Sequence, residues 1–164
     1  MHAGFGINEA PDDAANRGMR FFRLIEDLVH DVVFALSVEP DEQYRFLYVN
    51  PGFERTTGLA TSQVVGQLVD KVIPPHSLPL IKEKYREALK SGAAVHWDEI
   101  SNYPAGMKVG EVTIRPVIDA ETQQRFLVGT VHDVTERYSA QTRLSDMEER
   151  WRLALDASGG AAWD

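Results

Sequence analysis

His96 and Asp98 are the residues whose types and spacing come closest to a chemical site in this chain. They stand two positions apart in a segment rich in strand-forming residues, so both side chains would share one face of a strand. An imidazole beside a carboxylate could bind a metal, sense protons or transfer a proton in a small α+β enzyme. A His–Asp pair on a strand is more commonly an ordinary surface pair.

Other motifs of catalysis are missing from the sequence. It contains no phosphate-binding GxxxxGK[ST] loop, no HExxH helix and no nucleophile elbow. It also contains no cysteine, which excludes thiolate nucleophiles, disulfides and cysteine metal sites. We therefore expect neither catalytic residues nor a metal site in this chain.

The composition is typical of a soluble globular domain, with 43% hydrophobic and 26% charged residues among 164. The net charge of -8 argues against a nucleic-acid partner, because such a surface needs clustered Lys and Arg. No apolar run reaches the ~18 residues that a membrane span requires. Together with the absence of cysteine, these features predict a cytoplasmic domain without membrane contact.

The first part of the chain predicts a tail, a helix and a β-hairpin. Residues 1–17 are small, polar and acidic and predict a flexible tail, in which Asp12 and Asp13 could cap the following helix. Apolar residues recur at helical spacing over 18–30, so this helix would pack on the domain or on a partner. Two strand-forming segments then flank a turn, at 32–38 and 44–50.

The middle of the chain predicts short helical pieces, one longer helix and three strands. Glycines break residues 51–66 into short pieces, and Ser77 could cap a helix that runs to about Lys90. The strands follow at 95–101, 108–118 and 125–132. This order predicts an α+β fold with one five-stranded antiparallel sheet, helices on one face, and a helix at each end.

The last predicted strand runs directly into a polar helix through Asp133-Val134-Thr135-Glu136-Arg137. Asp133 and Thr135 could each cap amides at the start of this helix, and with Arg137 they form a predicted signal-transfer junction. Over 137–157 an apolar seam recurs at alternating spacings, with Leu144, Met147, Trp151 and Ala154. The seam indicates either a short dimeric coiled coil or a single amphipathic linker helix packed on its own domain.

A faint repeat links the two ends of the chain. Residues 151–156 echo residues 22–27, with three of six positions identical. The repeat lies where a second copy of the domain would begin. We therefore expect residues 158–164 to start a second, truncated copy within a longer tandem protein.

Four pieces of the sequence resemble the PAS sensory domain family, namely Asn50-Pro51-Gly52-Phe53, Gly58, Val65-Gly66 and the terminal segment 129–137. The resemblance covers about residues 20–137, with the domain itself at 31–136. Gln63 stands where the family often has Glu, and Pro104-Ala105-Gly106 replaces its usual Asp-Gly turn. The resemblance implies a five-stranded antiparallel sheet with helices over one face, often around a small cavity.

The resemblance also allows a comparison with the light-sensing flavin branch of the family. After the glycine matched by Gly66, that branch has an Asn, an adduct-forming Cys and a Gln. Their places here are taken by Leu68, Val69 and Ile73. Val131 replaces a flavin-facing Gln in the last strand, and without a thiol no cysteinyl-flavin adduct can form.

Haem-binding members of the family supply a histidine from the helix that corresponds to 77–90. That helix contains none, and His76 precedes it at a turn, so we do not expect haem. Flavin or haem held by another residue, without a covalent bond, stays open at this point. The cofactor is therefore unknown.

Strand parity predicts which interior positions could line a ligand pocket, namely Trp97, Val112, Ile114, Leu127 and Val131. If Trp97 points inward, His96 and Asp98 must face solvent. Core packing alone requires the same apolar faces, so a pocket and a filled core are both open.

The family resemblance favours a sensory or dimerisation module of a sensor histidine kinase, in which a ligand or partner shifts the junction and the linker helix. The alternatives are a PAS module of a diguanylate cyclase or phosphodiesterase, a ligand-free interaction module, and a small enzyme that uses Asp98 or His96. The expected partners are a second copy, bound through the N-terminal or linker helix, a small ligand, and downstream PAS and output domains.

Overall fold

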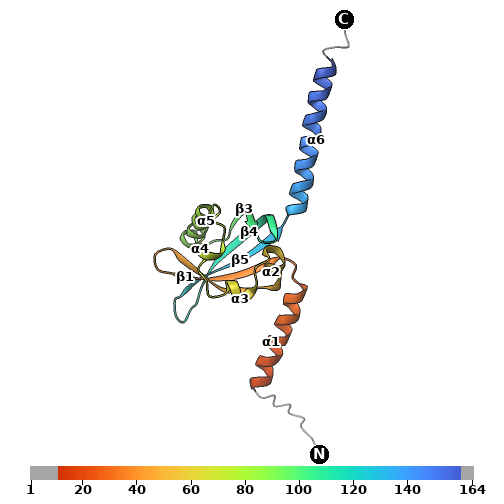
Figure 1. Cartoon of the computed structure of the whole chain (residues 1–164). Coiled ribbons are helices and arrows are strands. Elements are labelled where there is room, and N and C mark those ends of the chain that lie inside the picture. Colours follow the sequence, from red (N-terminus) through yellow and green to blue (C-terminus); the bar gives the residue numbers. More distant parts are fainter. Residues whose placement is uncertain (1–10, 160–164) are drawn as a thin grey trace, which may run out of the picture.

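Five strands form the centre of the molecule: β1 (Val32–Glu39), β2 (Gln43–Val49), β3 (Val95–Tyr103), β4 (Gly106–Ile118) and β5 (Arg125–Asp133). They pair in one antiparallel sheet in the order β2-β1-β5-β4-β3, which confirms the predicted α+β fold. The computed structural model describes residues 11–159, and Figure 1 shows the sheet with its short helices beside it. Because β1 pairs with β5, the start and the end of the domain lie side by side.

Four helices connect β2 to β3: α2 (Pro51–Thr57), α3 (Thr61–Val64), α4 (Val69–Val72) and α5 (Leu78–Ser91). The helix α4 was not predicted, because a single turn is too short to show helical periodicity. Ser77 stands at the N-cap of α5 but makes no capping hydrogen bond, so the predicted cap is wrong. Its hydroxyl lies 2.7 Å from the Ser101 hydroxyl on β3 instead.

The hydrophobic core lies between the helices and one face of the sheet. Alternate residues of the strands point to this face, as the period of a strand requires. Aromatic rings bind the two layers together: Phe46 and Phe53 lie 5.8 Å apart, and Tyr44 and Tyr85 lie 4.9 Å apart, both edge-on. Edge-on pairs of this kind contribute about 0.5–1.5 kcal/mol each beyond the burial of their area.

The N-terminal helix α1 (Pro11–Leu28) begins before the predicted start at residue 18. The predicted tail is therefore wrong for residues 11–17, and residues 1–10 lie outside the described residues. Asp12 and Asp13 lie within the helix and not ahead of it. Residues 14–17 of this first part are exposed to solvent, and the segment lacks an apolar stripe, so periodicity could not reveal it.

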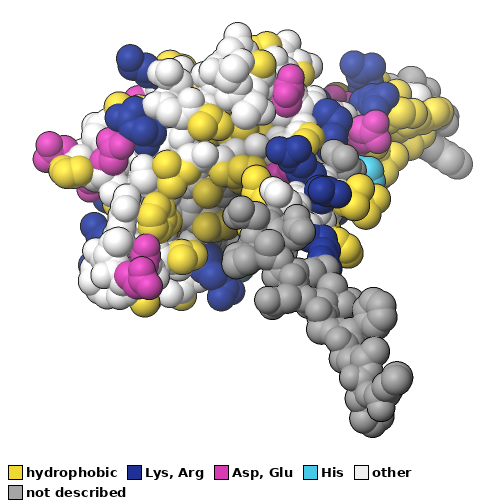
Figure 2. All heavy atoms as spheres, turned by 90° about the horizontal axis from the view of Figure 1, so that it is seen from below, with side chains coloured by type: hydrophobic (Ala, Val, Ile, Leu, Met, Phe, Trp, Pro, Cys, Tyr) yellow, Lys and Arg dark blue, Asp and Glu magenta, His cyan; other side chains and the backbone are white. Residues whose placement is uncertain are grey.

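The apolar part of α1 has little of the expected packing on its own domain. The Phe22 ring lies 6.0 Å from the Tyr48 ring, and the Tyr48 hydroxyl donates a hydrogen bond to Glu26. Six large apolar side chains of the helix stay exposed, namely Met19, Phe21, Phe22, Leu24, Ile25 and Leu28. In the view from below, hydrophobic side chains also reach the surface elsewhere, some of them in a hollow (Figure 2).

The C-terminal helix α6 (Thr135–Gly159) leaves the domain in the direction opposite to α1 (Figure 1). Its seam is open, because Leu144, Met147 and Trp151 are 58%, 56% and 65% exposed and Ala154 is exposed as well. The alternative of a linker helix packed on its own domain is therefore wrong. Within residues 11–159, no helix is long and apolar enough to cross a membrane.

The structure also bears on the predicted second copy. Ser158 and Gly159 continue α6, so the helix extends two residues past the predicted end of the linker at residue 157. The other residues of that prediction, 160–164, lie outside the described residues.

Candidate functional site

His96 and Asp98 lie on the outer, exposed face of β3, because Trp97 between them points into the core. The parity expectation for these three residues is confirmed. The His96 Nδ1 atom lies 2.8 Å from the Thr113 hydroxyl of β4 on the same outer face. Across residues 11–159, no three His, Cys, Asp or Glu side chains gather as a metal site. The pair thus faces solvent and lines an open hollow on the outer face of β3 and β4, separate from the core of the domain.

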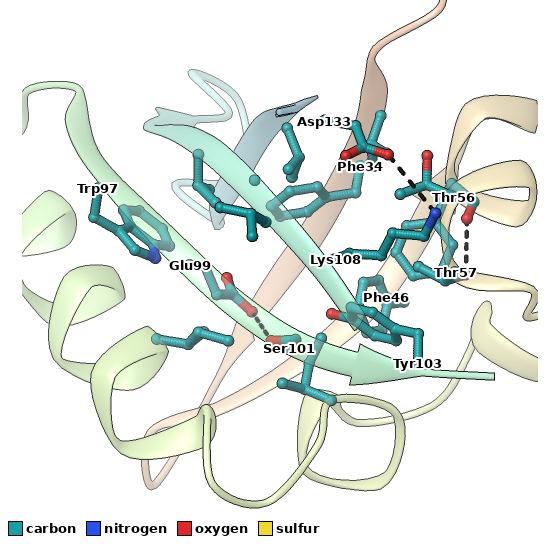
Figure 3. Close-up of a pocket in the computed structure, with 18 of the residues that line it drawn as sticks. Phe34, Phe46, Thr56, Thr57, Trp97, Glu99, Ser101, Tyr103, Lys108 and Asp133 are labelled. Carbon is teal, nitrogen blue, oxygen red and sulfur yellow. Dashed lines mark hydrogen bonds and ion pairs between the residues drawn. The ribbon is translucent and has the colours of Figure 1, made fainter. Parts of the chain in front are cut away.

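A partly open cavity of about 70 Å³ lies between the inner face of the sheet and the helices (Figure 3). Its lining is mainly aromatic and aliphatic. The polar and charged side chains of the lining are Thr56, Thr57, Glu99, Ser101, Tyr103, Lys108 and Asp133. Electrostatic interactions are strong in such an apolar setting, because little water screens the charges.

Glu99 is the half-buried carboxyl group of this cavity. It points inward because Trp97, Glu99, Ser101 and Tyr103 alternate along β3. The Ser101 hydroxyl donates to Glu99 Oε1 at 2.7 Å. Burial raises the pKa of Glu99, against the smaller lowering effects of Ser101, the Trp97 indole and His76. Burial and the Glu99 charge also raise the pKa of Tyr103.

The Trp97 indole nitrogen is buried without a hydrogen-bond partner, and in the part of the chain that the structure describes no other buried side-chain N or O atom is unpaired. Trp97 is only 9% exposed, and its nitrogen is on the side of the ring toward Glu99 (Figure 3). A buried donor left unpaired costs about 1–3 kcal/mol. The indole and the carboxyl group of Glu99 together form the polar end of the cavity.

Lys108 and Asp133 mark a second charged region of the cavity, beside Thr56 and Thr57 (Figure 3). The Lys108 Nζ atom lies 3.9 Å from Asp133 Oδ2, so the pair is loose. Both residues lie at strand ends, Lys108 near the start of β4 and Asp133 at the end of β5. The cavity therefore extends to the junction between β5 and α6.

The junction between β5 and α6 is held by five interactions. Asp133 Oδ1 accepts a hydrogen bond from the Thr135 amide at 3.0 Å, which caps the first turn as predicted. The Thr135 hydroxyl donates to Asp133 and accepts from the Val109 amide of β4 at 2.9 Å. Thr135 thus caps a strand amide and not the helix, contrary to the prediction. The Val134 amide donates to the Val109 carbonyl at 2.9 Å, and Arg137 forms an ion pair with Glu111 at 2.6 Å.

The sequence profile of the family described as the PAS fold matches residues 27–139, which is most of the chain and the whole sheet with its helices. The chain belongs to the PAS fold family. Solved structures agree on the fold. A PAS domain from Colwellia psychrerythraea is 18% identical with a TM-score of 0.60, over 72% of this chain and 98% of that one.

Two further structures similar to this PAS domain come from signalling proteins. A PAS domain from a two-component sensor histidine kinase is 17% identical with a TM-score of 0.56, over 73% of this chain and 98% of that one. An RNA-binding light-oxygen-voltage receptor is 23% identical with a TM-score of 0.60. The match to the receptor covers 94% of this chain and 42% of that one. At these identities the likeness shows the fold alone.

A flavin or a haem does not fit the cavity of this PAS domain. Pockets for drug-sized ligands measure roughly 300–1,000 Å³, whereas this cavity measures about 70 Å³. Val69, at the position of the adduct-forming Cys, is fully buried in the core. The cavity as it stands suits a much smaller molecule.

The predicted pocket residues fall into two groups. Trp97, Val112 and Val131 line the cavity, whereas Ile114 and Leu127 lie fully buried in the PAS core beyond the lining. The prediction missed the polar positions on β3, chiefly Glu99, Ser101 and Tyr103. Continuing the alternation from Trp97 along the strand would have found them.

Proposed function

We propose that this PAS domain is the sensory module of a signal-transduction protein and passes the state of its cavity to α6 through the β5–α6 junction. One observation carries the proposal: Lys108, Val109 and Asp133 line the cavity, and two of them also hold the start of α6. A ligand that moves Val109 or Asp133 would change the contacts of Thr135.

The coupling would act through the loose ion pair. A ligand that displaces Lys108 from Asp133 leaves the Asp133 carboxylate free to reorient, although it also caps the Thr135 amide. The first turn of α6 then loses a fixed partner, and the helix pivots about Val109, whose carbonyl holds Val134. A small displacement at the junction would be amplified along the length of α6.

The open seams of α1 and α6 support a homodimer as part of this function. Leu144, Met147 and Trp151 would be covered by a second copy in a parallel coiled coil, as would the apolar side chains of α1. Sedimentation should then show a concentration-dependent dimer, and Trp151→Glu should weaken it about tenfold or more, as for an aromatic anchor. A protein that stays monomeric at high concentration would contradict the dimer.

A distance measurement tests the coupling directly. Because the chain has no cysteine, spin labels on Lys90→Cys in α5 and Glu149→Cys in α6 are unique, and both positions are exposed. Lys108→Met should shift or broaden the label distance distribution measured by pulsed electron spin resonance. Lys84→Met is the matched control, because Lys84 is a half-buried lysine of α5 that pairs with Glu87 and does not line the cavity. Identical distributions for both variants would refute the coupling.

For the parent protein we propose a cytoplasmic sensor histidine kinase, with a second PAS domain after α6. The kinase is supported by the family and by the similar fold of the sensor histidine kinase domain. A diguanylate cyclase or phosphodiesterase is the alternative output. Sequencing the gene beyond the codon for residue 164 would distinguish the two. A phosphoacceptor-histidine helix there would indicate a kinase, and a GG[DE]EF segment would indicate a cyclase.

A further inference from the structure

We propose that the cavity binds a small organic cation, an alkylammonium ion, with Glu99 as its counter-charge. Such an ion would be the signal for the proposed sensory function, so this assignment rests on that function. Three features of the cavity support it: an unpaired carboxyl group, an aromatic lining and a small volume.

The half-buried Glu99 has no full counter-charge among the described residues: His76 lowers its pKa, but burial is the larger effect and raises it, and His76 forms no ion pair with Glu99. Its one hydrogen bond in the described part of the chain comes from Ser101, and no Lys or Arg there forms an ion pair with it. Lys108, the lysine of the lining, pairs with Asp133 instead. Buried charges are generally paired, and a ligand cation would supply the missing partner.

Aromatic rings make up a large part of the cavity lining. Six of the lining residues are aromatic, namely Phe34, Phe46, Phe53, Tyr85, Trp97 and Tyr103. The negative face of an aromatic ring attracts a cation, and aromatic cages are a common way to bind ammonium groups. The same rings have no comparable attraction for an anion, and Glu99 would repel one.

The Trp97 indole supports the ionised form of Glu99. Its N–H has no hydrogen-bond partner and is on the side of the ring toward Glu99 (Figure 3). A donor in this place favours the ionised form of Glu99, and the ionised carboxylate is the form that attracts a cation. Although the indole N–H is not placed well enough to form a full hydrogen bond, its proximity lowers the pKa of Glu99 in the same direction as Ser101, while burial raises it. A cation in the cavity would offset that effect of burial.

The volume limits the size of the ligand. A cavity of roughly 150 Å³ holds benzene, and this one measures about 70 Å³. An ion of about four non-hydrogen atoms, such as isopropylammonium, is therefore the appropriate probe. For so few atoms the Kd is expected to be no tighter than roughly 0.05 mM.

Three probes of equal size separate charge from shape: isopropylammonium chloride, propan-2-ol and sodium acetate. Each is titrated to about 100 mM, since binding is weak, at constant ionic strength while the Trp97 indole resonance is followed by ¹H–¹⁵N NMR. The ammonium ion should bind about 10- to 100-fold more tightly than the alcohol, as a charge-assisted hydrogen bond predicts. Glu99→Gln should remove this preference, and Glu83→Gln, exposed on α5, should keep it.

Equal binding of the ammonium ion and the alcohol, tighter binding of acetate, or no binding at all would overturn the proposal. If Glu99→Gln does not fold, the comparison of the three probes on the unaltered chain still decides. The label distances between α5 and α6 test the sensory coupling without any ligand. A failed titration with an intact coupling therefore rejects the ligand class and leaves the proposed function in place.

Discussion

The Phe34 ring on β1 lies directly against the backbone of Gly129, its partner across the ladder on β5. A Cβ atom on Gly129 would fall within 2.8 Å of three atoms of that ring, closer than real contacts allow. Phe34 in turn contacts Phe46 edge-on, with 6.4 Å between the ring centroids. The glycine therefore makes room for the aromatic wall of the cavity in the middle of the sheet.

Gly129→Ala should destabilise the domain by about 2–3 kcal/mol, because the ring must leave its place in a close-packed core. Chemical denaturation measures the free energy of unfolding. Phe34→Leu in the same chain should relieve the clash, so the double variant should be more stable than the sum of the two single effects predicts. If the effects of the two substitutions on the free energy of unfolding were strictly additive, this would contradict the contact between Phe34 and Gly129.

Asn50 should be among the most sensitive polar residues of the domain. Its side chain is 1% exposed, accepts from the amides of Val33 and Phe53, and donates to the Asp31 carbonyl. Asn50→Ala leaves these groups unpaired and should lower the free energy of unfolding by about 3 kcal/mol. Asn102→Ala, on the exposed side of β3, should change it by less than about 0.5 kcal/mol. Similar values for the two variants would speak against this role.

Thr135→Val should loosen the start of α6 without unfolding the sheet. The substitution keeps the branched shape but removes the acceptor for the Val109 amide, at a cost of about 1 kcal/mol. Hydrogen exchange should become faster at Val109 and in the first turn of α6. Thr135→Ser retains the hydroxyl and should exchange as the unaltered chain does. Unchanged exchange in Thr135→Val would show that this bond does not fix the junction.

His132 should titrate above its ordinary value. The Asp31 carboxylate lies 2.7 Å from His132 Nδ1, and this hydrogen bond, with the attraction of the charge, raises the pKa of His132 above 6.5. Asp31→Asn should bring the pKa, measured by NMR, back toward 6.5, whereas Asp98→Asn should not.

The sign of the pH effect follows from that direction. Because the folded state holds the His132 proton more tightly than the unfolded state, the contribution is fully present below pH 6.5. It is lost as the pH rises through the raised pKa of the folded state. The stability difference between the chain and Asp31→Asn should therefore shrink from mildly acid to alkaline pH, and a difference that grows would contradict the assignment.

Strand periodicity and turn residues were enough to predict the sheet and the inward face of β4, whereas the inward face of β3 was left open. The alternation in β4 placed Val112 and Ile114 inside, and both are buried. The junction segment 133–137 was also recognisable, because a strand pattern changes there to a helical one. These features are local, and local patterns reflect the period of the backbone itself.

The sequence by itself determined the fold class, the family resemblance and the point where α6 begins. Only the tertiary structure decided that Thr135 holds Val109, that Ser77 contacts Ser101, and that Glu99 meets no lysine. These relationships join residues far apart in the chain, so they depend on strand pairing and on how the helices pack over the sheet. Side-chain period cannot specify such contacts, because it fixes the face on which a residue lies but not what meets it there.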